Sequence, residues 1–287
     1  MYVDLFEKKR FKVNLHTHTS LSDGRRSPSE ALRLYREHGY DAVALTDHWV
    51  WTENAEAEGI TVLSGIEYNC GGSDGRDGVF HIVGIGCTSA PAATKSMGAQ
   101  ELIDAIHAAG GLAVLAHPAW SLNTHDQILP LEGVDATEIY NTTSGLHHSR
   151  RPDASLIVDM LGARGRFYPL IADDDTHYYD GDECKSFIMV RAEDASTESL
   201  TEAIAAGDFY ASQGPEVHLK KEGDEYVAYT SPCASIVFLS NLVWSRRAFE
   251  GEGLTEARYK PREGERYLRV EVTDADGKRA WTNILPL

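Results

Sequence analysis

The stretch NLHTHTSLSDG, residues 14–24, places two histidines one residue apart and follows them with an aspartate and a glycine. Side chains of a strand alternate between its two faces, so a strand here puts His16 and His18 on the same face. Two imidazoles on one face, with Asp23 just downstream, suit a divalent metal ion. The pattern also fits a strand that merely exposes two polar groups, and the rest of the chain has to decide.

Short apolar or β-branched runs alternate with amphipathic stretches over residues 1–212. The segment 27–30, SPSE, predicts a helix start, because it combines a capping serine, a proline in the first turn and a glutamate three residues after the cap. Gly39 predicts the end of this helix. Repeated β-then-α units predict a mainly parallel sheet, open or closed into a barrel, with ligands at the C-terminal ends of its strands. The expected strands are 13–15, 42–46, 61–66, 79–85, 112–116, 136–140, 168–172 and 187–190, and further helices are expected at 98–109, 152–161 and 198–206.

The pattern changes at Gln213-Gly214-Pro215, where turn-forming residues interrupt the chain. Period-two alternation is clearest in residues 267–272, and it predicts antiparallel strands. We therefore predict two parts, an α/β domain over 1–212 and a small β-rich domain or extension over 213–287. The expected strands of the second part are 217–219, 226–230, 236–239, 267–272 and 280–284.

The composition is that of an ordinary globular protein, with 287 residues, 42% hydrophobic and 25% charged. Lys plus Arg is 27 and Asp plus Glu is 44, and the net charge of −17 argues against binding to long nucleic acids or membrane surfaces. No run of about 18 apolar residues predicts a membrane span, and residues 1–12 lack the apolar core of a secretory signal. The four cysteines are scattered and predict free thiols, so a cytoplasmic enzyme is expected. The oligomeric state is not indicated.

Potential metal ligands recur at the ends of the expected strands of the first part. The C-terminal ends of parallel strands meet at one mouth, so we expect these side chains to converge. Taken singly, each has a structural interpretation, such as a strand-end polar residue, a core histidine or a helix cap. Their coincidence favours a metal cluster. The residues are His16, His18, Asp23, His48, Glu67, His81, His117, Asp175 and His177.

The sequence resembles the polymerase and histidinol phosphatase (PHP) superfamily of metal-dependent phosphoesterases. The matching motifs are HTHTSLSDG at 16–24, TDH at 46–48, GIE at 65–67, HIVG at 81–84, AHP at 116–118, EIYN at 138–141 and DTH at 175–177. The DDTH form, with GDFYASQGP and a β-rich tail, is most similar to the CehA/McbA-like subgroup. The resemblance implies a distorted (βα)7 barrel that holds two or three divalent ions.

The resemblance also implies three ligand groups that share one glutamate as a bridge. The groups are His16, His18, Glu67 and Asp175 for one ion; Glu67, His81 and His117 for a second; and Asp23, His48 and His177 for a third. The residues themselves agree, because mixed histidine and carboxylate ligands suit Mn²⁺, Fe²⁺/Fe³⁺ or Zn²⁺ rather than Ca²⁺.

The expected function is hydrolysis of a phosphate ester of a small metabolite, a monoester or a small diester, cyclic diesters included. A metal-bridging hydroxide would attack phosphorus while the ions neutralise the developing charge. Glu67, Asp23 and His177 are expected to be catalytic. Two alternatives stay open: metal-dependent hydrolysis of a carboxylic or carbamate ester or an amide, and a non-catalytic scaffold that the metal stabilises.

Contacts with the substrate are expected from two loops. Arg150 and Arg151 follow the EIYN motif on the side where substrate enters, and an arginine there can grip a phosphate bidentately; a solvated basic loop is the alternative. Trp120 follows the AHP motif and would stack on the substrate or cover the mouth. Nucleotide-cleaving relatives often carry an arginine there, so this sequence argues against a nucleoside bisphosphate or an oligonucleotide, and favours a small phosphorylated substrate.

Overall fold

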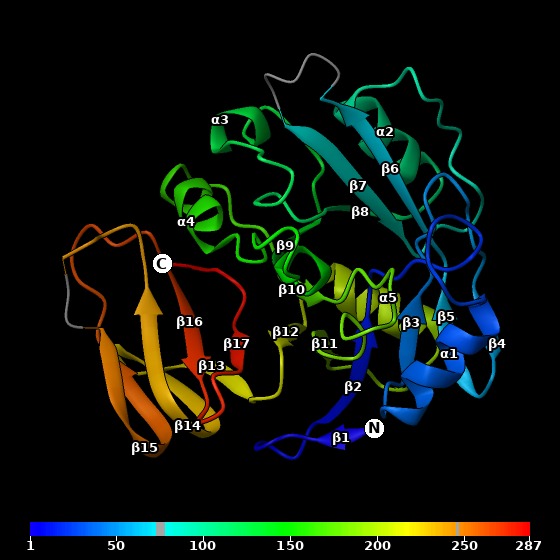
Figure 1. Ribbon diagram of the computed structural model, residues 1–287. Coiled ribbons are helices and arrows are strands. Elements are labelled where there is room, and N and C mark those ends of the chain that lie inside the picture. Colours follow the sequence, from blue (N-terminus) through cyan, green and yellow to red (C-terminus); the bar gives the residue numbers. More distant parts are fainter. Residues whose placement is uncertain (73–77, 245–246) are drawn as a thin grey trace.

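The computed structural model describes residues 1–72, 78–244 and 247–287, and its strands form two sheets (Figure 1). The strands up to the boundary predicted at residue 213 are β1 (Tyr2–Val3), β2 (Lys9–Asn14), β3 (Ala42–Ala44), β4 (Ala55–Ala57), β5 (Ile60–Leu63), β6 (Gly65–Gly71), β7 (Val79–Ile85), β8 (Leu112–Leu115), β9 (Ala136–Asn141), β10 (Leu170–Asp173), β11 (Phe187–Val190) and β12 (Phe209–Ser212). The later strands are β13 (Val217–Glu222), β14 (Glu225–Leu239), β15 (Ala248–Tyr259), β16 (Tyr267–Thr273), β17 (Arg279–Trp281) and β18 (Leu285–Pro286).

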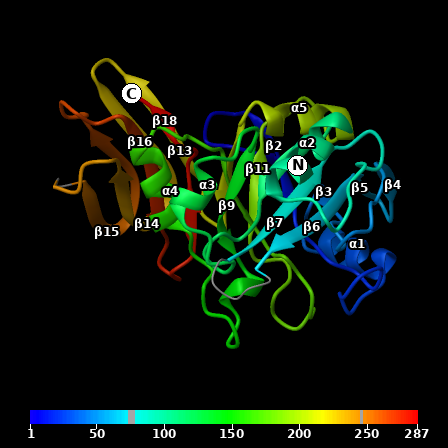
Figure 2. The same ribbon diagram turned by 90° about the horizontal axis from the view of Figure 1, so that it is seen from above.

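Helices connect the strands of the first part and lie outside the sheets (Figures 1 and 2). The helix α1 begins as its sequence predicts: Ser27 caps it, Pro28 occupies the first turn, and Glu30 completes a capping box. In the described part of the chain, no helix combines the length and the apolar character needed to cross a membrane. The helices are α1 (Pro28–Glu37), α2 (Ala99–Ala108), α3 (His125–Ile128), α4 (Ser155–Ala163) and α5 (Thr197–Ala205), with a 3-10 turn at Thr143–Gly145.

The two sheets bring parallel strands into the centre of the molecule. In the large sheet β2, β3 and β5 are adjacent and parallel, and in the small sheet β8, β9 and β10 are adjacent and parallel. Isolated bridges between Thr17 and Thr176, and between His48 and Glu67, link residues of the two sheets beyond the ends of β2, β3 and β10. The ends of these strands therefore face one another across a common space.

The mixed α/β class is confirmed, whereas a closed (βα)7 barrel is not shown. The strand pairs of the described residues leave the two sheets unclosed, and β7 runs antiparallel to both β6 and β8. The strand expected at 61–66 divides between the sheets, because β5 ends at Leu63 and β6 begins at Gly65. A Cβ atom at Gly65 would lie 2.4 Å from the carbonyl oxygen of Leu45, so only glycine permits this close crossing.

The β-rich tail continues the large sheet rather than standing apart from it (Figure 1). The strand β12 pairs with β17, and β17 pairs with β16. Trp281 and Tyr267 of the tail lie in the same buried cluster as Val13 and Ile188. The tail thus shares the core of the first part, and the division into two domains at residue 213 stays a prediction.

Candidate metal centre

Nine predicted ligands lie at or beyond the facing strand ends. His16, His18 and Asp23 follow β2, His48 follows β3, and His117 follows β8. Glu67 lies in β6, His81 in β7, and Asp175 and His177 follow β10, so these four residues and His117 come from the small sheet. The contacts described next show that the structure brings all nine together.

Four ligand atoms form a compact buried group. Nε2 of His16 lies 3.2 Å from Nε2 of His18, and each of these nitrogens lies 3.2 Å from Oδ1 of Asp175. Oε2 of Glu67 lies 3.2 Å from the first nitrogen and 3.0 Å from the second. Ligand bonds of about 2.0–2.1 Å place the corners of a regular tetrahedron about 3.3–3.4 Å apart. The four atoms therefore have the spacing that a tetrahedral ion requires.

Glu67 connects this group to a second one. Its Oε1 lies 2.6 Å from Nδ1 of His81 and 3.3 Å from Nε2 of His117, and its Oε2 lies 3.1 Å from Nδ1 of His48. Both oxygens of one buried carboxylate thus face imidazole nitrogens. This is the arrangement that a carboxylate bridging two ions needs.

A third group lies nearer to solvent, around Asp23, whose side chain is 56% exposed. Its carboxylate lies 3.5 Å from Nε2 of His177, 3.8 Å from Nε2 of His48 and 3.6 Å from Nδ1 of His18. A neutral imidazole offers one lone pair. His18 can therefore bind only one ion. If its Nε2 binds the ion of the first group, the ligands left for the third group are Asp23, His48 and His177.

Buried polar atoms without hydrogen-bond partners also indicate that these residues fit a divalent cation. Among the residues that the structure describes, Oε2 of Glu67, Oδ1 of Asp175 and Nδ1 of His48 are buried and have no hydrogen-bond partner. Buried acceptors without donors are costly. A cation in the buried group of His16, His18, Glu67 and Asp175 would satisfy both carboxylate oxygens.

The imidazoles and carboxylates of these three groups form a cage, and their charges stabilise one another. Burial by itself would lower the pKa of His18, but its contacts with Asp175 and Glu67 outweigh burial and raise that pKa to about 9. Burial by itself would raise the pKa of Glu67, but His16 and His81 hold it well below its usual range. Without a cation, protons on the imidazoles would balance the carboxylates, and divalent cations would displace these protons on binding.

Two ligands are held in a backbone conformation that non-glycine residues rarely adopt. Asp175 has a φ of 54° and His117 a φ of 27°. Such conformations cost about 1–3 kcal/mol each and persist only where neighbours impose them. Here the N–H of Asp175 donates to the carbonyl of His16 at 2.9 Å, and the N–H of His117 donates to the carboxylate of Glu138 at 2.9 Å. The fold thus aims these side chains before any ligand binds.

Glu138 contacts two of the predicted ligands, although sequence reasoning left it without a role in spite of its place at the start of the EIYN motif. Its Oε1 lies 2.7 Å from Nδ1 of His16, and its Oε2 accepts hydrogen bonds from the N–H of His117 and from Nδ2 of Asn141. A carboxylate behind an imidazole fixes which ring nitrogen faces the metal. Glu138 therefore positions two ligands from different groups.

Two further carboxylates hold the loops of the site. Asp47 accepts hydrogen bonds from backbone and hydroxyl groups of Thr19 and Ser22, so it secures the loop before Asp23 rather than orienting the ring of His48. Asp182 accepts from the backbone N–H of His177 at 2.8 Å.

Gly24 follows Asp23 in the first of these loops. A Cβ at this position would lie 2.4 Å from the carbonyl oxygen of His18, so the close approach of the loop to His18 requires glycine.

A cavity of about 270 Å³ opens onto the cluster. In the described parts of the chain, no lysine or arginine lines it. Trp120 lies in its wall, packed edge-on against the rings of His81 and His117 at 5.6 and 5.0 Å between centroids. Arg150 and Arg151 are exposed and lie outside the lining. The other lining residues are Asp23, His48, Glu67, Thr143, Ser144, His148, Ser149, Asp175, His177 and Tyr178.

Trp120→Ala is expected to weaken substrate binding more than removal of either arginine. An aromatic contact contributes about 0.5–1.5 kcal/mol, which corresponds to a two- to tenfold rise in KM. We expect Arg150→Ala and Arg151→Ala to change KM less than twofold, since neither side chain reaches the cavity. Steady-state kinetics with p-nitrophenyl phosphate measure these effects, with the exposed Trp244→Ala as the matched control. A rise in KM of more than twofold for either arginine variant would show that this arginine contacts the substrate.

Comparison with known proteins supports the fold. No family model and no curated protein matches the sequence. The structure is similar to that of a two-domain protein from Bacteroides vulgatus containing a predicted PHP-like metal-dependent phosphoesterase, with 13% identity, a TM-score of 0.55, and coverage of 97% of this chain and 96% of that chain. An amidohydrolase from Chromobacterium violaceum matches with 17% identity, a TM-score of 0.43 and coverage of 59% and 89%. The lesion-specific endonuclease EndoQ from Pyrococcus furiosus matches with 14% identity, a TM-score of 0.45 and coverage of 69% and 56%.

The fold and the site together define a mixed α/β protein with a histidine–carboxylate cage at facing strand ends. The likeness to the Bacteroides vulgatus protein extends over nearly the whole chain, tail included. This chain therefore has a PHP-like fold, in agreement with the motifs of its sequence.

Proposed function

We propose that this protein is a metal-dependent phosphoesterase. The observation that carries the proposal is the buried group of His16, His18, Glu67 and Asp175, with unpartnered carboxylate oxygens and the spacing of a tetrahedral ion. Two or three divalent ions, Mn²⁺, Fe²⁺/Fe³⁺ or Zn²⁺, would neutralise phosphoryl oxygens and lower the pKa of a water towards neutrality.

The chain's own residues would position the reactants. Glu67 faces both inner groups, so it fixes their separation. At the mouth, Asp23 and His177 lie 3.5 Å apart between carboxylate and imidazole, and they are partly exposed. We propose that this pair supplies the proton that the leaving alkoxide needs when two ions are bound. A third ion held by the pair would neutralise the alkoxide instead. Trp120 and Tyr178 form the wall around the leaving group and restrict water there.

Hydrolysis of a carboxylic or carbamate ester or an amide is the second candidate. The lining without lysine or arginine among the described residues favours it, because a phosphate would find no cationic side chain in this cavity and would depend on the metal ions alone. A neutral ester needs no such grip. The two candidates share the cluster and differ in the bond that is cleaved.

Metal removal is expected to reduce hydrolysis of p-nitrophenyl phosphate or its bis-ester at least about a hundredfold, because the ions stabilise the charge of the transition state. Added Mn²⁺ should restore the rate. The assay compares EDTA-treated, metal-reloaded protein on p-nitrophenyl phosphate, bis(p-nitrophenyl) phosphate and p-nitrophenyl acetate. Turnover of the acetate alone would contradict phosphoesterase activity and support hydrolysis of a carboxylic ester. An unchanged rate after EDTA would exclude the metal mechanism, and metal binding without turnover would favour a scaffold.

Several narrower expectations belong to this proposal. They are the CehA/McbA-like subgroup, the distorted (βα)7 barrel, the small phosphorylated substrate, the absence of nucleic-acid and membrane partners, and the cytoplasmic location. The sequence motifs support the subgroup and the barrel, and the scattered cysteines support the location. The net charge argues against nucleic-acid and membrane partners, and the small cavity favours a small substrate.

A further inference from the structure

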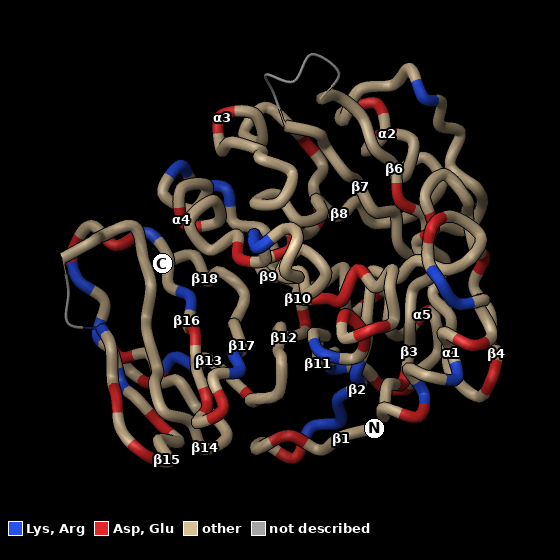
Figure 3. Tube along the Cα trace, in the orientation of Figure 1, with Lys and Arg blue, Asp and Glu red and all other residues tan. Residues whose placement is uncertain are grey.

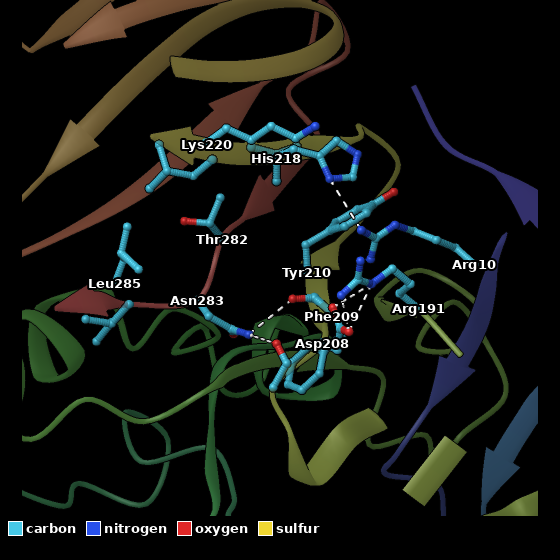
Figure 4. Close-up of a pocket in the computed structure, with 14 residues that line it drawn as sticks. Arg10, Arg191, Asp208, Phe209, Tyr210, His218, Lys220, Thr282, Asn283 and Leu285 are labelled. Atoms are coloured by element: carbon cyan, nitrogen blue, oxygen red, sulfur yellow. Dashed lines mark hydrogen bonds and ion pairs between the residues drawn. The ribbon is translucent and has the colours of Figure 1, made fainter. Parts of the chain in front are cut away.

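A second cavity, of about 330 Å³, lies where β12 meets β13 and the C-terminal segment (Figure 4). It shares no lining residue with the cavity at the metal cluster. Acidic segments lie throughout the trace in Figure 3, yet the charged side chains lining this cavity are mainly basic. They are Arg10, Arg191, Lys220 and one carboxylate, Asp208, with His218 beside them.

The basic groups of this cavity keep N–H donors that make no hydrogen bond to any described residue. In the described ranges of the chain, Nη1 of Arg191 makes no hydrogen bond, because Asp208 engages only Nε and Nη2. Nζ of Lys220 lies over the ring of Phe6, and no described residue forms a hydrogen bond or ion pair with it. Nη2 of Arg10, a residue 8% exposed, has only a 3.5 Å contact with Nδ1 of His218. Figure 4 shows both guanidinium groups on the same side of the cavity.

The neighbouring carboxylates are already engaged, so they neither bind a cation nor block an anion directly. Asp4 accepts from Nε of Arg10 at 2.7 Å and from two backbone N–H groups. Glu216 accepts from the hydroxyl of Tyr2, from the N–H of Leu5 and from Nε2 of His218. Asp4, Glu216 and His218 lie close enough to suggest a cation site, but Arg10 already supplies the positive charge there.

Apolar side chains also line the cavity. Leu219, Ile284 and Leu285 line it, and Figure 4 shows Leu285 across the cavity from the guanidinium groups. A cavity of this size is in the range that holds small organic molecules. Charge-assisted hydrogen bonds from arginine and lysine recognise phosphate and carboxylate groups.

We propose that this cavity binds a small organic anion, whose phosphate or carboxylate group meets Arg191, Lys220 and Arg10 and whose short apolar body lies against Leu285. The site needs no metal ion and is separate from the proposed catalytic centre. Its ligand class follows from the basic groups and from Leu285, which lies across the cavity from the two guanidinium groups.

Calorimetric titration of the metal-loaded full-length chain tests the proposal. The probes are hexylphosphonate, which has no ester bond to hydrolyse, hexanoate and inorganic phosphate. Comparison of the two hexyl probes separates phosphate from carboxylate recognition, and inorganic phosphate measures the contribution of the apolar body. We expect Arg191→Gln/Lys220→Gln to weaken hexyl-probe binding at this site at least about tenfold, since bonds to charged groups are lost. Turnover of p-nitrophenyl phosphate should not change.

The control is Arg164→Gln/Lys95→Gln, which removes the same charges from exposed positions outside the cavity. Lys220→Gln alone, on an exposed side chain, provides a second variant if the double variant is poorly folded. Binding that is equal in the wild type and the Arg191→Gln/Lys220→Gln variant would place the probe at the metal centre and overturn the proposal. No saturable binding up to about 10 mM would overturn it as well.

Discussion

Glu67→Gln is expected to abolish metal loading and turnover together. Glutamine keeps the size of the side chain but presents an N–H donor and no charge to the imidazoles that now contact a carboxylate. A cation contributes several kcal/mol to transition-state stabilisation, and a loss of about 4 kcal/mol corresponds to about a thousandfold lower rate. Elemental analysis of the purified variant and its rate on p-nitrophenyl phosphate measure both effects.

Two matched variants separate the role of Glu67 from the general removal of a carboxylate. Glu132→Gln alters an exposed partner of Arg166 and should leave metal content and rate unchanged. Glu138→Gln weakens the support behind His16 and should cost about 10- to 100-fold in metal affinity or activity. Normal metal content and a normal rate in folded Glu67→Gln protein would show that this carboxylate does not bridge the groups.

Arg269→Ala is expected to lower the free energy of unfolding by about 1.5–3 kcal/mol, the usual contribution of hydrogen bonds to charged groups, because Arg269 is buried whereas its partner Asp159 is 25% exposed. Arg269, in β16 of the tail, is 1% exposed, and its Nε and Nη2 each donate to the carboxylate of Asp159 in α4 at 2.8 Å. Tyr267 also donates to Asp159 at 3.1 Å. Truncation of Arg269 leaves the carboxylate of Asp159 without its guanidinium partner and creates an empty space in the core. Urea unfolding followed by circular dichroism measures the change.

Arg258→Ala is the control, because this arginine lies in β15 of the same tail and forms only exposed ion pairs with Glu222, Glu225 and Glu256. It should change the free energy of unfolding by less than about 1 kcal/mol. Asp159→Leu/Arg269→Met should recover most of the loss, since an apolar pair replaces the buried ions. A loss below 1 kcal/mol for Arg269→Ala would mean that the tail does not depend on this pair.

The elements that the sequence predicted well are those whose causes are local. The start of α1 depends on Ser27, Pro28 and Glu30, which lie within one helical turn, and the structure contains this capping box. The strand expected at 79–85 coincides with β7, and the strand expected at 187–190 coincides with β11. In these cases the residues that specify the element lie within it or directly beside it in the sequence.

The elements that sequence reasoning missed depend on partners far away in the chain. The strand β15 is mostly exposed and carries no apolar alternation, and it exists because it pairs with β14. The strand β14 runs through Pro232, although the sequence indicated two separate strands, and its pairing with β15 shifts register on both sides of Cys233. Such bulges accommodate a proline that a regular ladder excludes.

The sequence by itself determined the kinds of ligand in this protein, their order along the chain and their positions at strand ends, because residue type and periodicity are local properties. Only the tertiary structure decided that both oxygens of Glu67 face imidazoles, that Glu138 stands behind His16, and that Arg150 and Arg151 lie outside the cavity. It also gathered Arg10, Arg191 and Lys220, from three distant segments, around a second cavity. These distances follow from how strands far apart in sequence pack together, and no short segment specifies that packing.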